Sequence, residues 1–105
     1  MKILLGTTSE HEIAFDGQLV IKGVYQSGRE LVQAVKDIMP DIVITDYILK
    51  DLDGIGLLNE LEGQENTKFI IYSELTNDFL ARIAVALGAV RVFKKDEERS
   101  QLFDF

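Results

Sequence analysis

The sequence predicts an α/β domain built on a parallel sheet. Short apolar runs alternate along the chain with segments whose apolar residues recur at helical spacing, as expected when each strand is followed by a crossover helix. The runs are apolar at consecutive positions, which is typical of strands covered on both faces. A chain of 105 residues has the size of one domain with one core. The expected strands comprise residues 2–5, 19–25, 41–45, 69–72 and 90–93.

Two capping-box patterns place the first two helices. Ser9 has a glutamate three residues later, so a helix is expected to begin there, and Gly17 keeps it short. Ser27 shows the same pattern, and the apolar spacing behind it predicts a helix over residues 29–39. Pro40 ends that helix because proline has no N–H to donate and its ring clashes with the preceding turn.

Two further helices follow the third and fourth strands. Residues 55–61 form a short helix, and residues 78–87 form a longer one with an apolar side. The longer helix begins after a cap at Thr76 or Asn77, both of which have side chains that accept hydrogen bonds from a helix N-terminus. Gly88 is suited to end it, because glycine adopts the left-handed conformation without strain.

The composition excludes several classes of function. Eighteen acidic and 11 basic residues give a net charge of -7, which argues against binding to nucleic acid or to an anionic membrane. The absence of cysteine excludes disulfides and thiolate metal or redox sites. The N-terminus is unlike a signal peptide, and no apolar stretch approaches the roughly 20 residues of a membrane span. We therefore expect a cytoplasmic domain.

Polar residues follow four of the five expected strands. They are Thr7 and Thr8, Asp46, Ser73, and Lys94 with Lys95. Because ligands of open α/β sheets bind beyond the carboxyl ends of the strands, we expect these side chains to share one edge. A carboxylate there can attack phosphorus, and a hydroxyl and an ammonium group are donors that a phosphoryl group needs. The same residues also suit simpler roles, in which Asp46 shapes a turn, Ser73 caps and Lys95 is solvated.

The segment PDIVITDYILKDLDGIGLLNEL resembles the phosphoacceptor region of response regulator receiver domains. In that family a strand ends in the acceptor aspartate and Asp-Gly closes the following loop, a spacing that Asp46 and Asp53-Gly54 share. The segment IIYSE resembles the fourth strand with its hydroxyl switch residue, which places that role on Ser73. The segment LGAVRVFKKD resembles the segment with the family's lysine, which is identified as Lys95, with Lys94 beside it. The resemblance covers residues 1 to about 100.

The resemblance implies a flavodoxin-like, doubly wound, five-stranded parallel sheet of order 2-1-3-4-5. The first helix is shortened and the fifth is missing or rudimentary, because only residues 97–105 remain for it. Since both faces of the central strands are apolar, we expect three helices to cover one face and leave the other nearly bare. A second copy or another segment of a longer protein would then cover it; the alternative is that Phe103 and Phe105 fold back and cover it alone. Residues 1–105 are accordingly interpreted as a receiver-like domain and the N-terminal part of a longer protein.

The departures from the family concern the pocket. Receivers carry an acidic pair after the first strand that holds Mg²⁺ together with the acceptor aspartate, and here those positions are Thr7 and Thr8. Threonine hydroxyls are weak ligands for a hard divalent cation, so we expect no bound metal and no other cofactor. The family's proline four residues after the acceptor is Lys50, its proline after the lysine is Asp96, and its aromatic switch residue is Val92.

The resemblance implies a signalling domain and not an enzyme. The leading hypothesis is an atypical receiver that keeps Asp46 and acts through contacts with a protein partner or a second copy. The alternative is an ordinary receiver that a histidine kinase phosphorylates on Asp46. A remote alternative, a cobalamin-binding domain, rests on the partial motif Ser9-x-His11-x-x-Ala14. The loop acids Asp51 and Asp53 are interpreted as solvated.

Overall fold

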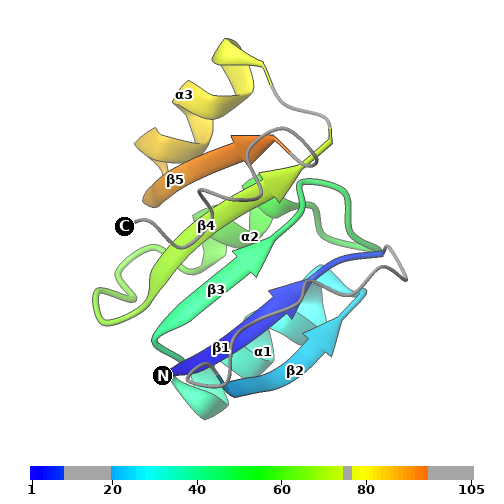
Figure 1. The fold of residues 1–105 in the computed structure, drawn as a ribbon, viewed down its shortest axis with the longest axis vertical. Helices are drawn as coiled ribbons and strands as arrows, with labels where there is room; N and C mark the ends of the chain where they lie inside the picture. The colour runs from blue at the N-terminus through cyan, green and yellow to red at the C-terminus, as the bar shows by residue number, and fades with distance from the viewer. Residues whose placement is uncertain (9–19, 75–76, 95–105) are drawn as a thin grey trace.

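The computed structural model describes residues 1–8, 20–74 and 77–94, and it alternates strands with helices along the chain (Figure 1). Each predicted strand is present within one or two residues of its expected bounds. The predicted helix at Ser9 and the helical turns at residues 97–105 lie outside the described residues. The elements are β1 (Lys2–Gly6), β2 (Val20–Tyr25), α1 (Gly28–Ile38), β3 (Ile42–Thr45), α2 (Gly54–Glu60), β4 (Lys68–Ser73), α3 (Asp78–Ala86) and β5 (Ala89–Lys94).

The five strands form one sheet in the order β2-β1-β3-β4-β5, and each neighbouring pair is parallel. This confirms the predicted flavodoxin-like arrangement. The chain begins at the inner strand β1, next to the edge, and extends first to one side through β2 and then to the other through β3 to β5 (Figure 1). The side on which successive strands are added to the sheet therefore changes between β1 and β3. Open α/β sheets bind ligands at such a position.

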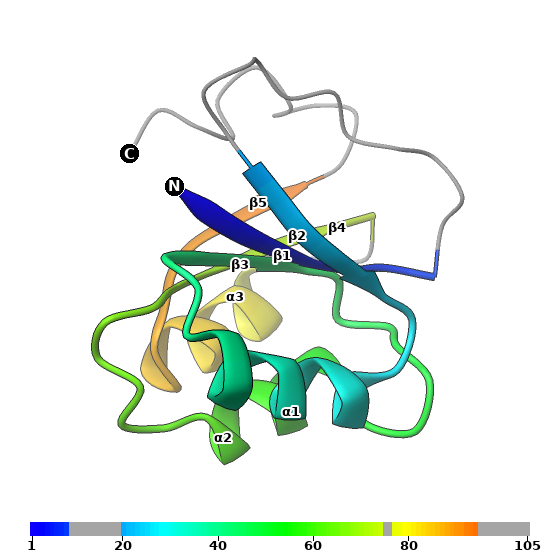
Figure 2. The ribbon, with the colours of Figure 1, turned by 90° about the horizontal axis from the view of Figure 1, so that it is seen from below.

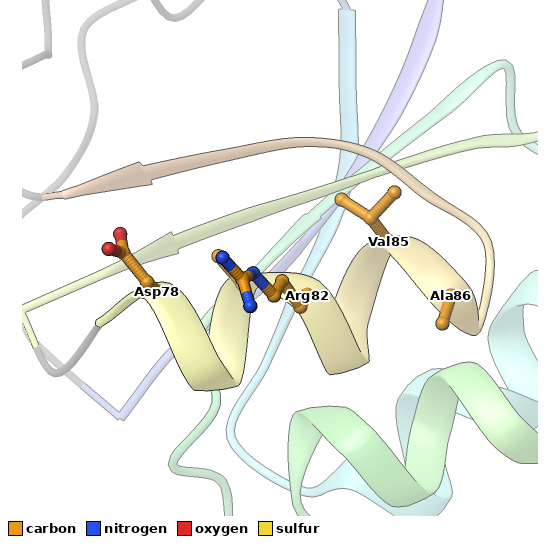
Figure 3. Close-up of a pocket in the computed structure, with 5 residues that line it drawn as sticks. Asp78, Arg82, Val85 and Ala86 are labelled. Carbon is orange, nitrogen blue, oxygen red and sulfur yellow. The ribbon is translucent and has the colours of Figure 1, made fainter.

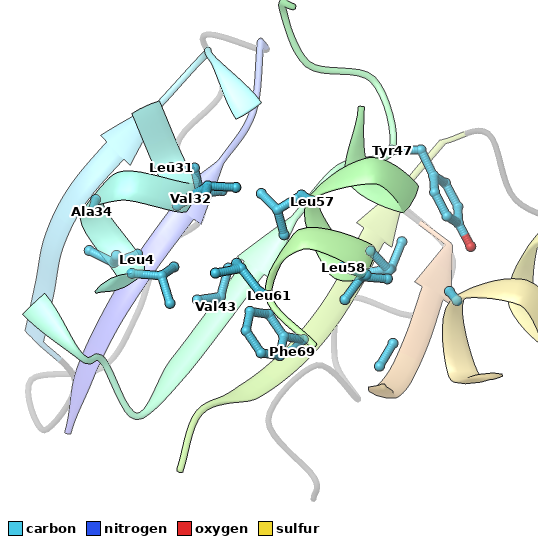
Figure 4. Close-up of a cluster of buried hydrophobic side chains, with 14 residues drawn as sticks. Leu4, Leu31, Val32, Ala34, Val43, Tyr47, Leu57, Leu58, Leu61 and Phe69 are labelled. Atoms are coloured by element: carbon cyan, nitrogen blue, oxygen red, sulfur yellow. The ribbon is translucent and has the colours of Figure 1, made fainter. Parts of the chain in front are cut away.

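The three described helices lie together on one face of the sheet, as predicted (Figure 2). Their apolar sides bury the side chains that alternate strand residues send to that face, Leu4, Val43 and Ile71 among them. Figure 4 shows the contact, with Leu31 of α1 and Leu57 of α2 above the strands. Burial on this face fixes the register of β1, β3 and β4, because a shift by one residue would reverse every side chain.

The opposite face of the sheet is apolar too. Its side chains form a second buried cluster, and each is at most 6 % exposed. The expectation that this face would be nearly bare in the single chain is therefore wrong. The cluster consists of Ile3, Leu5, Ile42, Ile44, Ile70, Tyr72 and Phe93.

Local signals set the helix ends. The Ser27 hydroxyl accepts a hydrogen bond from the Glu30 N–H at 3.2 Å, so the predicted cap of α1 is confirmed. α1 ends one residue earlier than expected, because the residue before a proline avoids the helical region and Met39 adopts φ 52°. Asn77 caps α3, and Gly88 after that helix has φ 113°. Within the described residues, every helix is too short or too polar to cross a membrane.

Candidate functional site

Asp46 lies at the carboxyl edge of the sheet, directly after β3. Its N–H donates to the carbonyl oxygen of Gly6 at 2.9 Å, which fixes the backbone between the ends of β1 and β3. Its Oδ1 accepts a hydrogen bond from the N–H of Ile48 at 3.1 Å, a turn in which the aspartate side chain bonds two residues ahead. The side chain is half-buried, so the carboxylate is both oriented by the backbone and open to the edge.

Ser73 is the last residue of β4, and its hydroxyl donates to Asp46 Oδ1 at 2.6 Å. The distance is that of a charge-assisted O–H···O bond. The serine is 1 % exposed, which limits the orientations that its hydroxyl can take. The two residues are 27 positions apart, and the parallel pairing of β3 with β4 brings them together, as the sequence predicted.

Of the two candidate lysines, the structure describes Lys94 and does not describe Lys95. Lys95, the position that the family resemblance selects, lies outside the described residues. Lys94 ends β5, is half-buried and is paired in register with Ser73. An ammonium-bearing residue therefore lies on the strand next to Ser73, at the same edge as Asp46.

The two threonines follow β1 at this edge. Gly6 is paired with Thr45, so Thr7 and Asp46 are the next residues of neighbouring strands. The Thr7 N–H donates to the carbonyl of Tyr25 at 2.9 Å, and Thr8 is exposed. A Cβ on Gly6 would lie 2.4 Å from the Thr45 hydroxyl oxygen and 2.6 Å from Leu31 Cδ2, so these two side chains occupy the space beside Gly6. The positions of the family's acidic pair thus lie beside Asp46 and carry hydroxyls.

The loop from Asp46 to α2 is closed as the Asp53-Gly54 motif predicts. The Gly54 N–H donates to the Tyr47 carbonyl at 2.8 Å, and a Cβ on Gly54 would lie 2.7 Å from the Asp46 carbonyl oxygen. The Asp53 side chain accepts from the Gly56 N–H at 2.7 Å and so caps α2. Asp53 is exposed, as expected for a solvated loop acid, and the cap is a further role that the interpretation did not include.

Sequence reasoning also missed Asp51. This exposed aspartate accepts hydrogen bonds from the Ser27 hydroxyl at 2.7 Å, the Arg29 N–H at 3.1 Å and the Leu52 N–H at 2.7 Å. The Ser27 hydrogen bond is the main cause that lowers the pKa of Asp51 below its ordinary value of 3.8, and the Arg29 and Leu52 N–H groups act in the same direction. No local motif indicates this role, because two of the donors are 22 and 24 residues away.

A shallow depression lies elsewhere, along the outer side of α3 (Figure 3). Its lining is Asp78, Ala81, Arg82, Val85 and Ala86. None of the sequence-predicted site residues borders it. The chemistry predicted for this chain therefore belongs to the carboxyl edge, and the depression is a feature of the helix surface.

Solved structures of receiver domains share this fold. A solved receiver domain of the response regulator NarL from Mycobacterium tuberculosis is similar over 98 % of this chain and 90 % of that one, with a TM-score of 0.83 and 18 % identity. The CheX-CheY-BeF3-Mg+2 complex from Borrelia burgdorferi contains a chain that is similar over 98 % of this chain and 84 % of that one, with a TM-score of 0.84 and 23 % identity. Both likenesses show the fold.

The family model of the response regulator receiver domain matches residues 10–105, so this chain belongs to that family. A probable transcriptional regulatory protein, SgaR of Hyphomicrobium methylovorum, is 30 % identical over 90 residues, which are 85 % of this chain and 43 % of SgaR. The chain therefore spans less than half the length of this curated relative. The match agrees with the receiver hypothesis, and the cobalamin alternative, which rested on residues 9–14, has no support from it.

Proposed function

We propose that this receiver domain is an atypical one that acts in cytoplasmic signal transduction through protein–protein contacts, without enzymatic turnover. The observation that carries the proposal is the composition of the carboxyl edge. Asp46 carries a carboxylate directly after β3, and hydroxyl-bearing residues follow or end the strands on either side: Thr7 after β1, and Ser73 at the end of β4, whose hydroxyl lies 2.6 Å from Asp46 Oδ1. The acceptor position is thus kept while the positions of the acidic pair are neutral.

This edge fits Mg²⁺ poorly. A hard divalent cation is held by charged oxygen ligands, and neutral hydroxyls at Thr7 and Thr8 add no charge to that of Asp46. Within residues 1–8, 20–74 and 77–94, no three histidine or acidic side chains gather closely enough to hold a metal ion. The described residues of this edge therefore supply too little negative charge to hold a divalent cation.

The arrangement also disfavours phosphoryl transfer to Asp46. A phosphoryl group carries negative charge that receivers neutralise with the cation, and a nearby lysine and hydroxyl only partly replace it. In addition, Oδ1 of Asp46 already accepts hydrogen bonds from Ser73 and Ile48, which lowers the nucleophilicity of that oxygen.

Exposed apolar side chains on α3 and β5 support a role in protein contacts. Phe79 is 72 % exposed, Val85 is 56 % exposed and Val90 is 48 % exposed, an apolar surface on the last helix and strand that the structure describes. Exposed apolar side chains on these two elements provide apolar area that contact with another protein would bury. The chain of Borrelia CheY, which is similar in fold, is described in a complex with the protein CheX.

The test is to add Mg²⁺ with acetyl phosphate or beryllofluoride to the full chain and to follow the amide resonances of Thr7, Asp46 and Ser73, together with the intact mass. We expect resonances close to those of the untreated protein and no phosphoryl adduct. The matched variant, Thr7→Asp with Thr8→Asp, restores the acidic pair and is expected to gain Mg²⁺ affinity. Tight Mg²⁺ binding or an adduct on Asp46 in the unmodified chain would contradict the proposal and support an ordinary receiver that a histidine kinase phosphorylates.

A further inference from the structure

The first turn of α1 is capped by two segments that are far apart in the sequence. A helix leaves its first N–H groups without partners inside the helix, so other groups must satisfy them. The Gly28 N–H donates to the Lys50 carbonyl at 3.0 Å, and the Arg29 N–H donates to Asp51 Oδ1 at 3.1 Å. The Glu30 N–H donates to the Ser27 hydroxyl at 3.2 Å. Two of these three acceptors thus come from the loop that follows Asp46.

The contact between α1 and this loop is also a backbone contact. The Lys50 N–H donates to the Gln26 carbonyl at 2.8 Å, and Ser27 and Lys50 form an isolated parallel bridge. A Cβ on Gly28 would lie 1.9 Å from the carbonyl oxygen of Leu52. The start of α1 and the loop after Asp46 therefore approach each other as closely as paired strands, and only glycine fits at position 28.

Asp51 has the backbone and the side chain that this junction needs. Its φ of 60° is left-handed, a conformation that aspartate tolerates better than most residues. That conformation presents one carboxylate oxygen to the N–H groups of Arg29 and Leu52 and the other to the Ser27 hydroxyl. The Ser27 hydroxyl in turn accepts from Glu30, so one continuous set of hydrogen bonds joins the loop to the helix.

We propose that Asp51 is a positioning residue that holds the loop after Asp46 against the first turn of α1, so that the Asp46 edge and the N-terminus of α1 move as one unit. The loop is fixed at its start by the Ile48 N–H on Asp46 and at its end by the Gly54 N–H on Tyr47. Asp51 supplies the fixed point between them. A partner that displaces either element must displace the other, and such coupling is reciprocal. The proposal is independent of whether Asp46 is phosphorylated.

The experiment compares Asp51→Gly with Asp51→Asn in the full chain by native-state hydrogen exchange and amide resonances. Glycine keeps the left-handed backbone without strain and removes the acceptor, whereas asparagine keeps an acceptor oxygen in the same place. We expect Asp51→Gly to speed exchange at Arg29 and Lys50 by about tenfold or more, as loss of a charged acceptor implies. The Asp46 and Ile48 resonances should shift in the same variant. Asp51→Asn should restore most of both effects.

Two controls separate coupling from a general loss of stability. Asp37→Asn removes one exposed acid from the other end of α1, where its carboxylate accepts a hydrogen bond from the Gln33 side chain at 3.0 Å, and it should leave exchange at Arg29 and Lys50 unchanged. The Val43 amide, in the middle of the sheet, reports global unfolding, so its exchange rate measures the loss of global stability in each variant, whereas shifts of the native-state Asp46 and Ile48 resonances report the junction itself. Unchanged exchange at Arg29 in Asp51→Gly would overturn the proposal. So would faster exchange confined to α1 with the Asp46 and Ile48 resonances unmoved.

Discussion

Asp46 and Asp51 are five residues apart in one loop, and they differ in exposure and in the groups that their carboxylates contact. Asp46 is half-buried at the edge of the sheet and accepts hydrogen bonds from Ser73 and Ile48. Asp51 is exposed, yet it accepts three hydrogen bonds and joins its loop to a helix. Exposure alone would have assigned the structural role to Asp46 and the solvated role to Asp51.

The backbone conformation at each position determines which groups the carboxylate contacts. Asp46 continues the extended strand β3, so its side chain stays at the edge where ligands of such sheets bind. Asp51 is left-handed, so its side chain turns back toward the helix N-terminus, where a negative charge is favourable.

The largest effect is expected for Gly28→Ala, which breaks the junction on the side of α1. The added Cβ would meet the Leu52 carbonyl at 1.9 Å, and a backbone oxygen cannot rotate away as a side chain can. We expect a loss of about 2–3 kcal/mol in the free energy of unfolding, measured in urea, as for other overpacked sites. Alanine is otherwise the better helix former by about 1 kcal/mol, so the sign is informative.

Gly63→Ala is the matched control for that substitution. Gly63 has φ 93° and nothing within 4 Å of an added Cβ, so the variant carries backbone strain without a steric clash. Its cost should be roughly 1–2 kcal/mol. A Gly28→Ala protein as stable as the wild type would show that the close contact between α1 and the loop is not present in solution.

The second prediction concerns the other aspartate. A double-mutant cycle of Asp46→Ala with Ser73→Ala isolates the hydrogen bond of 2.6 Å between them. We expect a coupling energy of about 1.5 kcal/mol in urea unfolding, because the hydroxyl is buried and the acceptor is charged. Additive effects of the two substitutions would indicate that Ser73 donates elsewhere in solution and that the edge is looser than the structure shows.

The sequence predicted most of the fold because each strand and helix carries a local signal. Continuous apolar runs marked the five strands, and Ser27 marked the start of α1 through a capping box. The bounds of β4 and β5 extend beyond their apolar runs to Ser73 and Lys94, since parallel pairing with a neighbour continues into the polar residues. Only tertiary contacts determine that extension.

The site could be predicted only in part, for the same physical reason. The meeting of Asp46 with Ser73 follows from the order of the strands, and the family resemblance supplied that order. The role of Asp51 depends on Ser27 and Arg29 at the start of α1, which only tertiary packing brings close to the loop. Burial of the second face was also missed, since a count of helices per face does not show which side chains are covered.

The third prediction concerns Asp53, the remaining acid of the loop. Asp53→Ala removes the cap of α2, the hydrogen bond of 2.7 Å from the Gly56 N–H. We expect a loss of about 1 kcal/mol in the free energy of unfolding. Asp53→Asn keeps a good capping side chain and should change the free energy of unfolding by only roughly a few tenths of a kcal/mol. Equal losses in both variants would mean that charge at the helix N-terminus, and not the cap geometry, supplies the stabilisation.

The smallest effect is expected in the pH dependence that Asp51 contributes. The Ser27 hydrogen bond lowers the pKa of Asp51 in the folded protein below its ordinary value of 3.8, so the folded state favours the charged carboxylate. Its contribution to stability is therefore present above the unfolded pKa and is lost as the pH falls through the folded one. The wild type should be more stable than Asp51→Asn at neutral pH, and urea midpoints should converge as the pH falls below 3.8. Because the carboxylate is exposed, salt should reduce the difference. An advantage of the wild type that grew toward acid pH would show that the charged form of Asp51 is not the form that holds the loop.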